Sequence, residues 1–186
     1  MKKSFTTALL LILPLIAHSK TETEEKLQAL QLLKKYTETV ACYTTFDAEK
    51  DMRKLLKNVI TIEIDQTPYH ERHIFYILWN GNIGCTDGNS LNTYKISEVS
   101  KYNGPPKNEK ASYILTNQNP LGDDLDNKVN SNFIEEIKLI NKETIAIISF
   151  EQAPDDSRNS ASKKYQYIFK YDGFEWKMTN RKFIKN

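Results

Sequence analysis

The sequence is short of the residues from which catalytic and metal centres are built. It contains two cysteines and three histidines in 186 residues, so cysteines alone cannot close a structural zinc site. No serine lies in a Gly-x-Ser-x-Gly elbow, and no glycine-rich loop carries the lysine that binds phosphate. The sequence therefore nominates no reaction and favours a protein that is not an enzyme.

Two local patterns look like metal motifs, but one fails on spacing and the other on residue type. His70 and His73 are three positions apart, whereas the zinc helix motif needs histidines one helical turn apart, at i and i+4. Asp124, Asp126 and Glu135 echo the first, third and last ligands of a calcium loop, but a lysine and a valine occupy the middle positions. We therefore predict neither a metal nor another cofactor.

The N-terminal segment is typical of a secretory signal peptide. Two lysines precede an apolar run over residues 8–16, and residues 17–19, Ala-His-Ser, place small side chains where a signal peptidase cleaves. The run is too short to span a bilayer comfortably, and no later stretch is long and apolar enough to do so. We expect residues 1–19 to be removed and the mature chain to lie in the periplasm or outside the cell, with no membrane anchor.

The expected mature chain is electrically neutral. Removing residues 1–19 takes away two lysines and no acid, which leaves 24 basic and 24 acidic side chains. Neutrality argues against nucleic acid or an anionic membrane as the main partner, because both reward a basic face. The remaining chain of about 167 residues is long enough for one domain with its own core and too short for two. We therefore predict a single domain over residues 20–186.

The stretch over residues 74–79, IFYILW, is apolar on both alternating faces. Such a run predicts a strand in the middle of a sheet with a layer packed over each face, and Asn80-Gly81 marks its expected end. Cys85 follows in a turn-rich loop, where we predict a disulfide with Cys42 because the export signal indicates an oxidising compartment. Closing the loop of about forty residues between the two cysteines stabilises the fold by roughly 4 kcal/mol. The alternatives are two buried thiols, or a zinc site completed by the two mature histidines.

The other segments indicate an α+β protein. Helical spacing of leucines predicts a helix over residues 22–41, and Asp47 is suited to cap a shorter helix over residues 48–57. Alternation predicts strands at residues 59–65, 92–101 and 111–116, followed by two hairpins. In the last hairpin Asp172-Gly173 makes the turn, and Phe174, Trp176 and Met178 alternate on the return strand.

We therefore expect an N-terminal helix or helical hairpin packed on a curved, mostly antiparallel sheet of about seven strands. A helix followed by a meander that ends in Asp172-Gly173-x-x-Trp176 looks like the cone-shaped folds of the nuclear-transport-factor-2 or cystatin type. This likeness is one of layout and implies no function.

Long polar loops over residues 102–110, 117–132 and 152–162 separate the expected strands, and such loops suit recognition of another protein. We interpret the chain as an exported binding protein of the bacterial envelope, of the inhibitor or immunity type. Such a protein covers the active site of a toxin or hydrolase. The acidic candidate contact residues suit a basic partner. Each of them is equally expected as an ordinary solvent-exposed side chain of a loop. The candidate contact residues are Tyr102, Pro105, Asp123, Asp124, Asp126, Asp155 and Asp156.

Two alternatives stay open. One is a small-ligand-binding or enzymatic cone-fold domain with a pocket inside the curved sheet, lined by aromatic side chains that would otherwise fill a core. The candidate pocket residues are His70, Tyr76, Trp79, Tyr94, Tyr167 and Trp176. The other alternative is a structural component of an envelope assembly, which would associate through an exposed strand edge.

Overall fold

The computed structural model describes residues 21–66, 71–85, 92–103, 111–157 and 159–184, and for residues 63–66 and 71 the backbone alone. The predicted signal segment, His70 and Pro105 lie outside this part of the chain. The helices are α1 Glu22–Val40, α2 Thr45–Ala48, the 3-10 helix η1 Lys54–Asn58 and α3 Asp123–Lys128. The strands are β1 Ala41–Cys42, β2 Val59–Gln66, β3 Glu71–Ile83, β4 Thr93–Asn103, β5 Ser112–Asn117, β6 Ile134–Asn141, β7 Thr144–Glu151, β8 Lys163–Tyr171 and β9 Trp176–Phe183.

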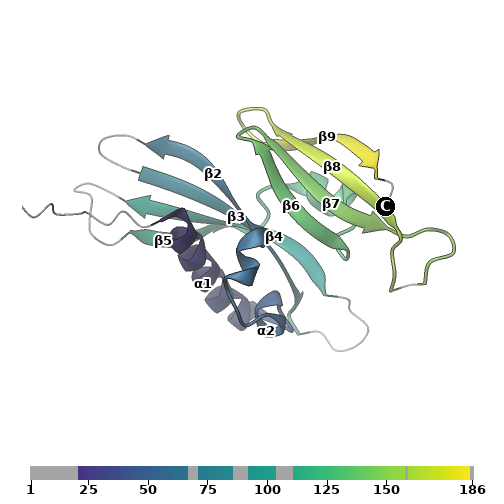
Figure 1. Cartoon of the computed structure of the whole chain (residues 1–186), viewed down its shortest axis with the longest axis horizontal. Coiled ribbons are helices and arrows are strands. Elements are labelled where there is room, and N and C mark those ends of the chain that lie inside the picture. The colour runs from purple at the N-terminus through teal and green to yellow at the C-terminus, as the bar shows by residue number, and fades with distance from the viewer. Residues whose placement is uncertain (1–20, 67–70, 86–91, 104–110, 158, 185–186) are drawn as a thin grey trace, which may run out of the picture.

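The described strands form two antiparallel sheets, and helix α1 adds a third layer (Figure 1). The first sheet has five strands in the order β1-β3-β4-β5, with β2 also paired to β3, and the second has four in the order β6-β7-β8-β9. Helix α1 packs on one face of the first sheet, and the second sheet packs on the other. The predicted α+β class with antiparallel pairing is confirmed. The described residues form nine strands in two sheets, whereas the sequence predicted about seven strands in one curved sheet.

Strand β3 lies inside the first sheet with a packed layer on each side, as its apolar run predicted. Successive side chains of β3 point to opposite faces of the sheet. One alternating set joins the core shared with the second sheet, and the other set joins the core beneath α1. The first set is Ile74, Tyr76 and Leu78. The second set is Phe75, Ile77 and Trp79. The two cores therefore meet at this strand.

Strand β3 continues past Asn80-Gly81, where the sequence predicted its end, and stops at Ile83. Glycine is used here for close approach rather than as a breaker. A Cβ atom on Gly81 would lie 3.1 Å from the Trp79 ring and 3.3 Å from the Ala41 Cβ. The short strand β1 can pair with the end of β3 because the glycine leaves this space.

The predicted disulfide is present and joins the two ends of this arrangement. Strand β1 pairs Cys42 with Asn82 of β3, and Gly84 turns the chain with a φ of 76°. Cys42 and Cys85 are thereby brought together, with their Cα atoms 5.2 Å apart and a sequence separation of 43. The bridge fastens the chain at the end of α1 to the end of β3, and it leaves neither thiolate for the alternative zinc site.

The first predicted helix is confirmed and the second is wrong. Thr21 and Glu24 cap α1 reciprocally, each side chain accepting a hydrogen bond from the backbone N–H of the other. The expected helix over residues 48–57 is replaced by α2 and η1. Asp47 accepts hydrogen bonds from the Thr44 N–H and hydroxyl, so it sits inside α2 instead of preceding a helix. The Thr44 cap begins the helix three residues earlier than the aspartate alone predicted.

The segment predicted as a polar loop over residues 117–132 is partly helical and partly buried. It contains α3, and three apolar side chains spaced four residues apart enter the core between the sheets: Leu121, Leu125 and Val129. None of the three is more than 5% exposed. The many polar residues between them hid this spacing. The segment carries the chain from β5 of the first sheet to β6 of the second.

Candidate functional site

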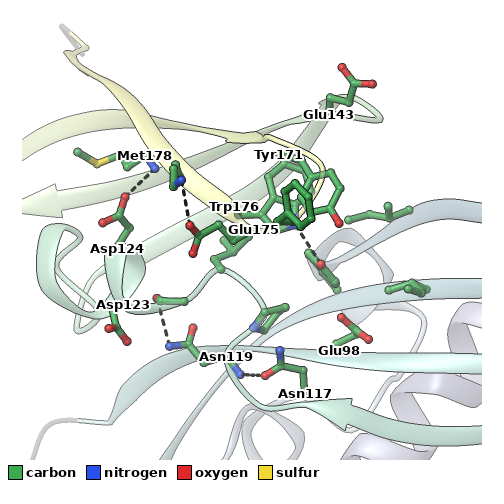
Figure 2. A pocket seen from close by; sticks show the side chains of 18 of the residues that line it. Glu98, Asn117, Asn119, Asp123, Asp124, Glu143, Tyr171, Glu175, Trp176 and Met178 are labelled. Carbon is green, nitrogen blue, oxygen red and sulfur yellow. Dashed lines mark hydrogen bonds and ion pairs between the residues drawn. The ribbon is translucent and has the colours of Figure 1, made fainter.

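A cleft with a volume of about 1050 Å³ lies between the two sheets (Figure 2). Side chains of β2, β3 and β4 line it from the first sheet, and the β6–β7 and β8–β9 hairpins line it from the second. Residues of the 117–128 segment complete the lining. The cleft is therefore built from segments that are far apart in the sequence.

A chain of aromatic side chains crosses the cleft from one sheet to the other. Trp176 of β9 donates a hydrogen bond from its Nε1 to the Tyr76 hydroxyl at 3.1 Å. The Trp176 ring lies 5.4 Å from the Tyr171 ring, measured between centroids. Burial raises the pKa of Tyr76 to about 12, so its hydroxyl stays protonated near neutral pH. The three side chains give the cleft a firm aromatic wall.

The acidic side chain of Asp124 attaches α3 to the second sheet. Its Oδ2 accepts a hydrogen bond from the Met178 N–H at 2.8 Å, and its Oδ1 lies 2.7 Å from the Lys128 Nζ. Lys128, with help from the Met178 N–H, lowers the pKa of Asp124. Asp123 beside it is exposed. Across the cleft Glu98 accepts a hydrogen bond from the Thr116 hydroxyl at 2.6 Å.

The turn between β8 and β9 spans residues 172–175, so the predicted two-residue turn is wrong. The Asp172 Oδ1 accepts hydrogen bonds from the N–H groups of Phe174 and Glu175 at 3.0 and 3.1 Å. Gly173 adopts a φ of 100°, which favours glycine. Phe174 consequently leaves the return strand, and its side chain is 93% exposed at the rim of the cleft.

The exposed apolar surface of the first sheet continues the cleft. Residues directly opposite each other in an antiparallel pair share a face. Arg72 and Ile74 line the cleft, and their neighbours in register are Tyr102 and, through Ser100, Ile114. Tyr102 is 47% and Ile114 is 54% exposed. Together with Tyr171 and Phe174 of the cleft lining, Tyr102 and Ile114 make a broad surface that is partly apolar.

The predicted contact residues of the 102–110 and 117–132 loops fall in or near the cleft where the structure describes them. Asp123 and Asp124 line the cleft, and Tyr102 lies on the continuation of its face. Asp126 accepts a hydrogen bond from the Asn119 Nδ2 at 2.9 Å.

The predicted contact residues of the 152–162 loop do not line the cleft in the described part of the chain. Asp156 accepts hydrogen bonds from the N–H groups of Ala153 and Ser162 at 2.7 and 2.8 Å, so it holds its own loop together. Asp155 is exposed. The structure therefore separates this loop from the other contact residues.

The predicted pocket residues divide between the cleft and the cores. Tyr76 and Trp176 line the cleft. Trp79 lies on the opposite face of β3, beneath α1, and donates a hydrogen bond to the Ser97 hydroxyl. Tyr94 and Tyr167 pack in the core between the sheets. The cleft lies between two sheets instead of inside one curved sheet, so sequence alternation alone did not locate it.

A buried charged cluster beneath α1 was missed by the sequence reasoning. The Glu25 Oε1 lies 2.6 Å from the Lys101 Nζ, and the Glu25 Oε2 lies 2.7 Å from the His73 Nδ1. Counted over the whole residue, Glu25 is 4% and Lys101 is 5% exposed. Glu25 stands in the buried row of α1 with Ala29 and Leu33, and this spacing of four was the signal that would have found it. We assign the cluster to the docking of α1 on β3 and β4.

In the part of the chain that the structure describes, no three metal-ligating side chains come together, and no helix is long and apolar enough to cross a membrane. No protein-family model matches the sequence, and no curated protein or solved structure is significantly similar to it. Function is therefore inferred from the geometry of the cleft.

Proposed function

We propose that the protein is an exported binding protein of the bacterial envelope, of the inhibitor or immunity type, and that the cleft binds its protein partner. The observation that carries this proposal is a convergence. Asp123 and Asp124, which we singled out as contact residues, line the same cleft as Tyr76 and Trp176, which we singled out as pocket residues.

The composition of the surface around the cleft supports a protein partner. Aromatic side chains and arginine are enriched in protein interfaces, and they supply most of the binding energy. The cleft and its rim offer Tyr171, Phe174 and Arg72, and Tyr102 lies on the adjoining face of the first sheet. The Cys42–Cys85 bridge supports the proposed location, because disulfides persist in oxidising compartments.

A pull-down from envelope extract of the native host tests this proposal, with residues 20–186 as bait and the disulfide intact. Asp123 and Asp155 give a matched pair of variants, since both are exposed acids and only Asp123 of the two lines the cleft. We expect one stoichiometric partner with the wild type and with Asp155→Arg, and its loss with Asp123→Arg. Recovery of no partner at any salt concentration, or an equal effect of the two variants, contradicts the proposal.

A second candidate function is the binding of a small molecule in the same cleft. The cleft volume of about 1050 Å³ is close to the upper end of the range for small-molecule sites, which is roughly 300–1,000 Å³. Native mass spectrometry of the protein purified from its host tests this function. A small adduct that is lost on unfolding would favour it, and an unmodified mass would count against it.

A further inference from the structure

The side chain of Phe174 is exposed to an unusual degree for an aromatic ring. It is 93% exposed, the highest value among the large apolar side chains that the structure describes. Single exposed apolar side chains are common on protein surfaces, so exposure alone does not mark a binding residue. The Phe174 ring differs in that it stands on a hydrogen-bonded turn at the rim of the cleft.

Hydrogen bonds within the turn restrict its conformation. The Asp172 carboxylate accepts from the N–H groups of Phe174 and Glu175, and the Asp172 N–H donates to the Glu175 carbonyl at 3.2 Å. The Tyr171 hydroxyl donates to the Gly173 carbonyl at 3.0 Å. The backbone that carries the Phe174 ring is therefore ordered before any partner arrives, which lowers the entropic cost of binding.

The base of the turn is anchored across both sheets. Tyr171 packs on Trp176, and Trp176 is hydrogen-bonded to Tyr76 of β3. The turn is thus connected by side-chain contacts to the first sheet as well as to the β8–β9 hairpin. Phenylalanine itself has two side-chain torsions, so fixing its ring in a partner costs little side-chain entropy.

The charges beside Phe174 are balanced within the turn. The Lys177 Nζ lies 2.9 Å from the Asp172 Oδ2 and 2.9 Å from the Glu175 Oε1. The two carboxylates nearest the ring in sequence therefore share a cation of their own. The surface that the tip presents is an apolar ring, and an apolar pocket is its chemical complement.

We propose that the β8–β9 turn is an insertion element that places the Phe174 ring in an apolar pocket of the partner protein. This rests on the proposed function and adds the part of the surface that enters the partner. The exposed Phe174 ring borders the cleft, so a partner with an apolar pocket beside a protruding segment fits both. A second copy of this chain is the competing occupant of the same surface.

Site-specific photocrosslinking in the native host tests the insertion. The photoreactive residue p-benzoylphenylalanine replaces Phe174, and in a control chain it replaces Tyr43, which is 76% exposed and does not line the cleft in the described structure. We expect an adduct with one other protein from position 174 and none from position 43. The crosslinked partner residue is expected to lie in an apolar pocket.

Affinity measurements with the crosslinked partner, once purified, complete the test. Phe174→Ser is expected to weaken binding about thirtyfold or more, as removal of an aromatic anchor does. Phe174→Trp is expected to stay within a few-fold of wild type, and Tyr43→Ser to bind like wild type. Phe174→Ser should also unfold at the wild-type temperature, because the ring is exposed.

Three outcomes overturn the inference. An adduct with a second copy of this chain assigns the turn to self-association. No adduct from position 174, while Asp123→Arg still abolishes capture of a partner, removes the insertion and leaves the proposed function standing. No adduct and no capture by any form of the protein removes both.

Discussion

Replacing Glu25 by glutamine is expected to destabilise the protein by about 3 kcal/mol, because it removes the buried carboxylate charge that both Lys101 and His73 contact. The Glu25 Oε1 lies 2.6 Å from the Lys101 Nζ, and the two side chains are 6% and 7% exposed. The Lys101 ammonium would then face an amide that carries no charge, and the docking of α1 on β4 would weaken.

This magnitude is large enough to measure by thermal unfolding. For a domain of this size, 1 kcal/mol shifts the midpoint by about 2–4 °C, so Glu25→Gln is expected to lower Tm by about 6–12 °C. Glu38→Gln is the matched control. Glu38 lies on the same helix and pairs with Lys34, but its side chain is 50% exposed, and exposed pairs contribute less than about 1 kcal/mol.

A double variant separates the effect of charge from that of packing. Glu25→Leu combined with Lys101→Met replaces the buried Glu25–Lys101 pair by apolar side chains but takes the Glu25 carboxylate away from His73, so it is expected to recover part of the stability that Glu25→Gln loses. A Tm for Glu25→Gln within about 1 °C of the Glu38→Gln value would refute the reasoning. That result would mean that the cluster does not hold α1 to the sheet.

Three further predictions concern the Cys42–Cys85 disulfide, Gly81 and the β8–β9 turn. Cys42→Ala combined with Cys85→Ala is expected to lower the unfolding free energy in urea by up to about 4 kcal/mol, and an unchanged value would contradict the bridge. Gly81→Val is expected to cost about 1–3 kcal/mol because its Cβ has no room, whereas a stability equal to wild type would show that β1 does not approach β3 so closely. Lys177 and two backbone N–H groups lower the pKa of Asp172 to about 2, so its bonds should persist above pH ~4 and be lost as the pH falls through about 2. Amide proton shifts of Phe174 against pH would show this, and a transition near pH 4 would contradict it.

The elements that the sequence predicted well are those whose signal is local. The apolar run over residues 74–79 indicated a strand covered on both faces, and the two cores on either side of β3 confirm it. The spacing of leucines and the acidic first turn located α1 to within one residue. The presence of just two cysteines after a predicted export signal indicated the disulfide. The first two inferences need only the periodicity of neighbouring residues, and the third needs only the number of cysteines and the predicted compartment.

The division into two sheets required information that local patterns do not contain. Alternation shows which side chains share a face, but it does not show which strands share a sheet. Residues 117–132 were interpreted as a loop because their polar residues outnumber three buried apolar ones. The cleft was missed because its lining residues, such as Glu98, Asp123 and Trp176, come from three distant segments. The sequence analysis placed Phe174 on the return strand. The Asp172 hydrogen bonds that lengthen the turn depend on the folded backbone and are not visible in the alternation of residues.

Amide hydrogen exchange of residues 20–186, alone and with the captured partner, tests most directly whether the cleft is the binding surface. We predict that the partner slows exchange in the 172–175 turn and in the 117–128 segment, which both border the cleft, and leaves the 152–162 loop unchanged. Protection confined to the 152–162 loop, with the turn and the 117–128 segment exchanging as in the free protein, would contradict the account.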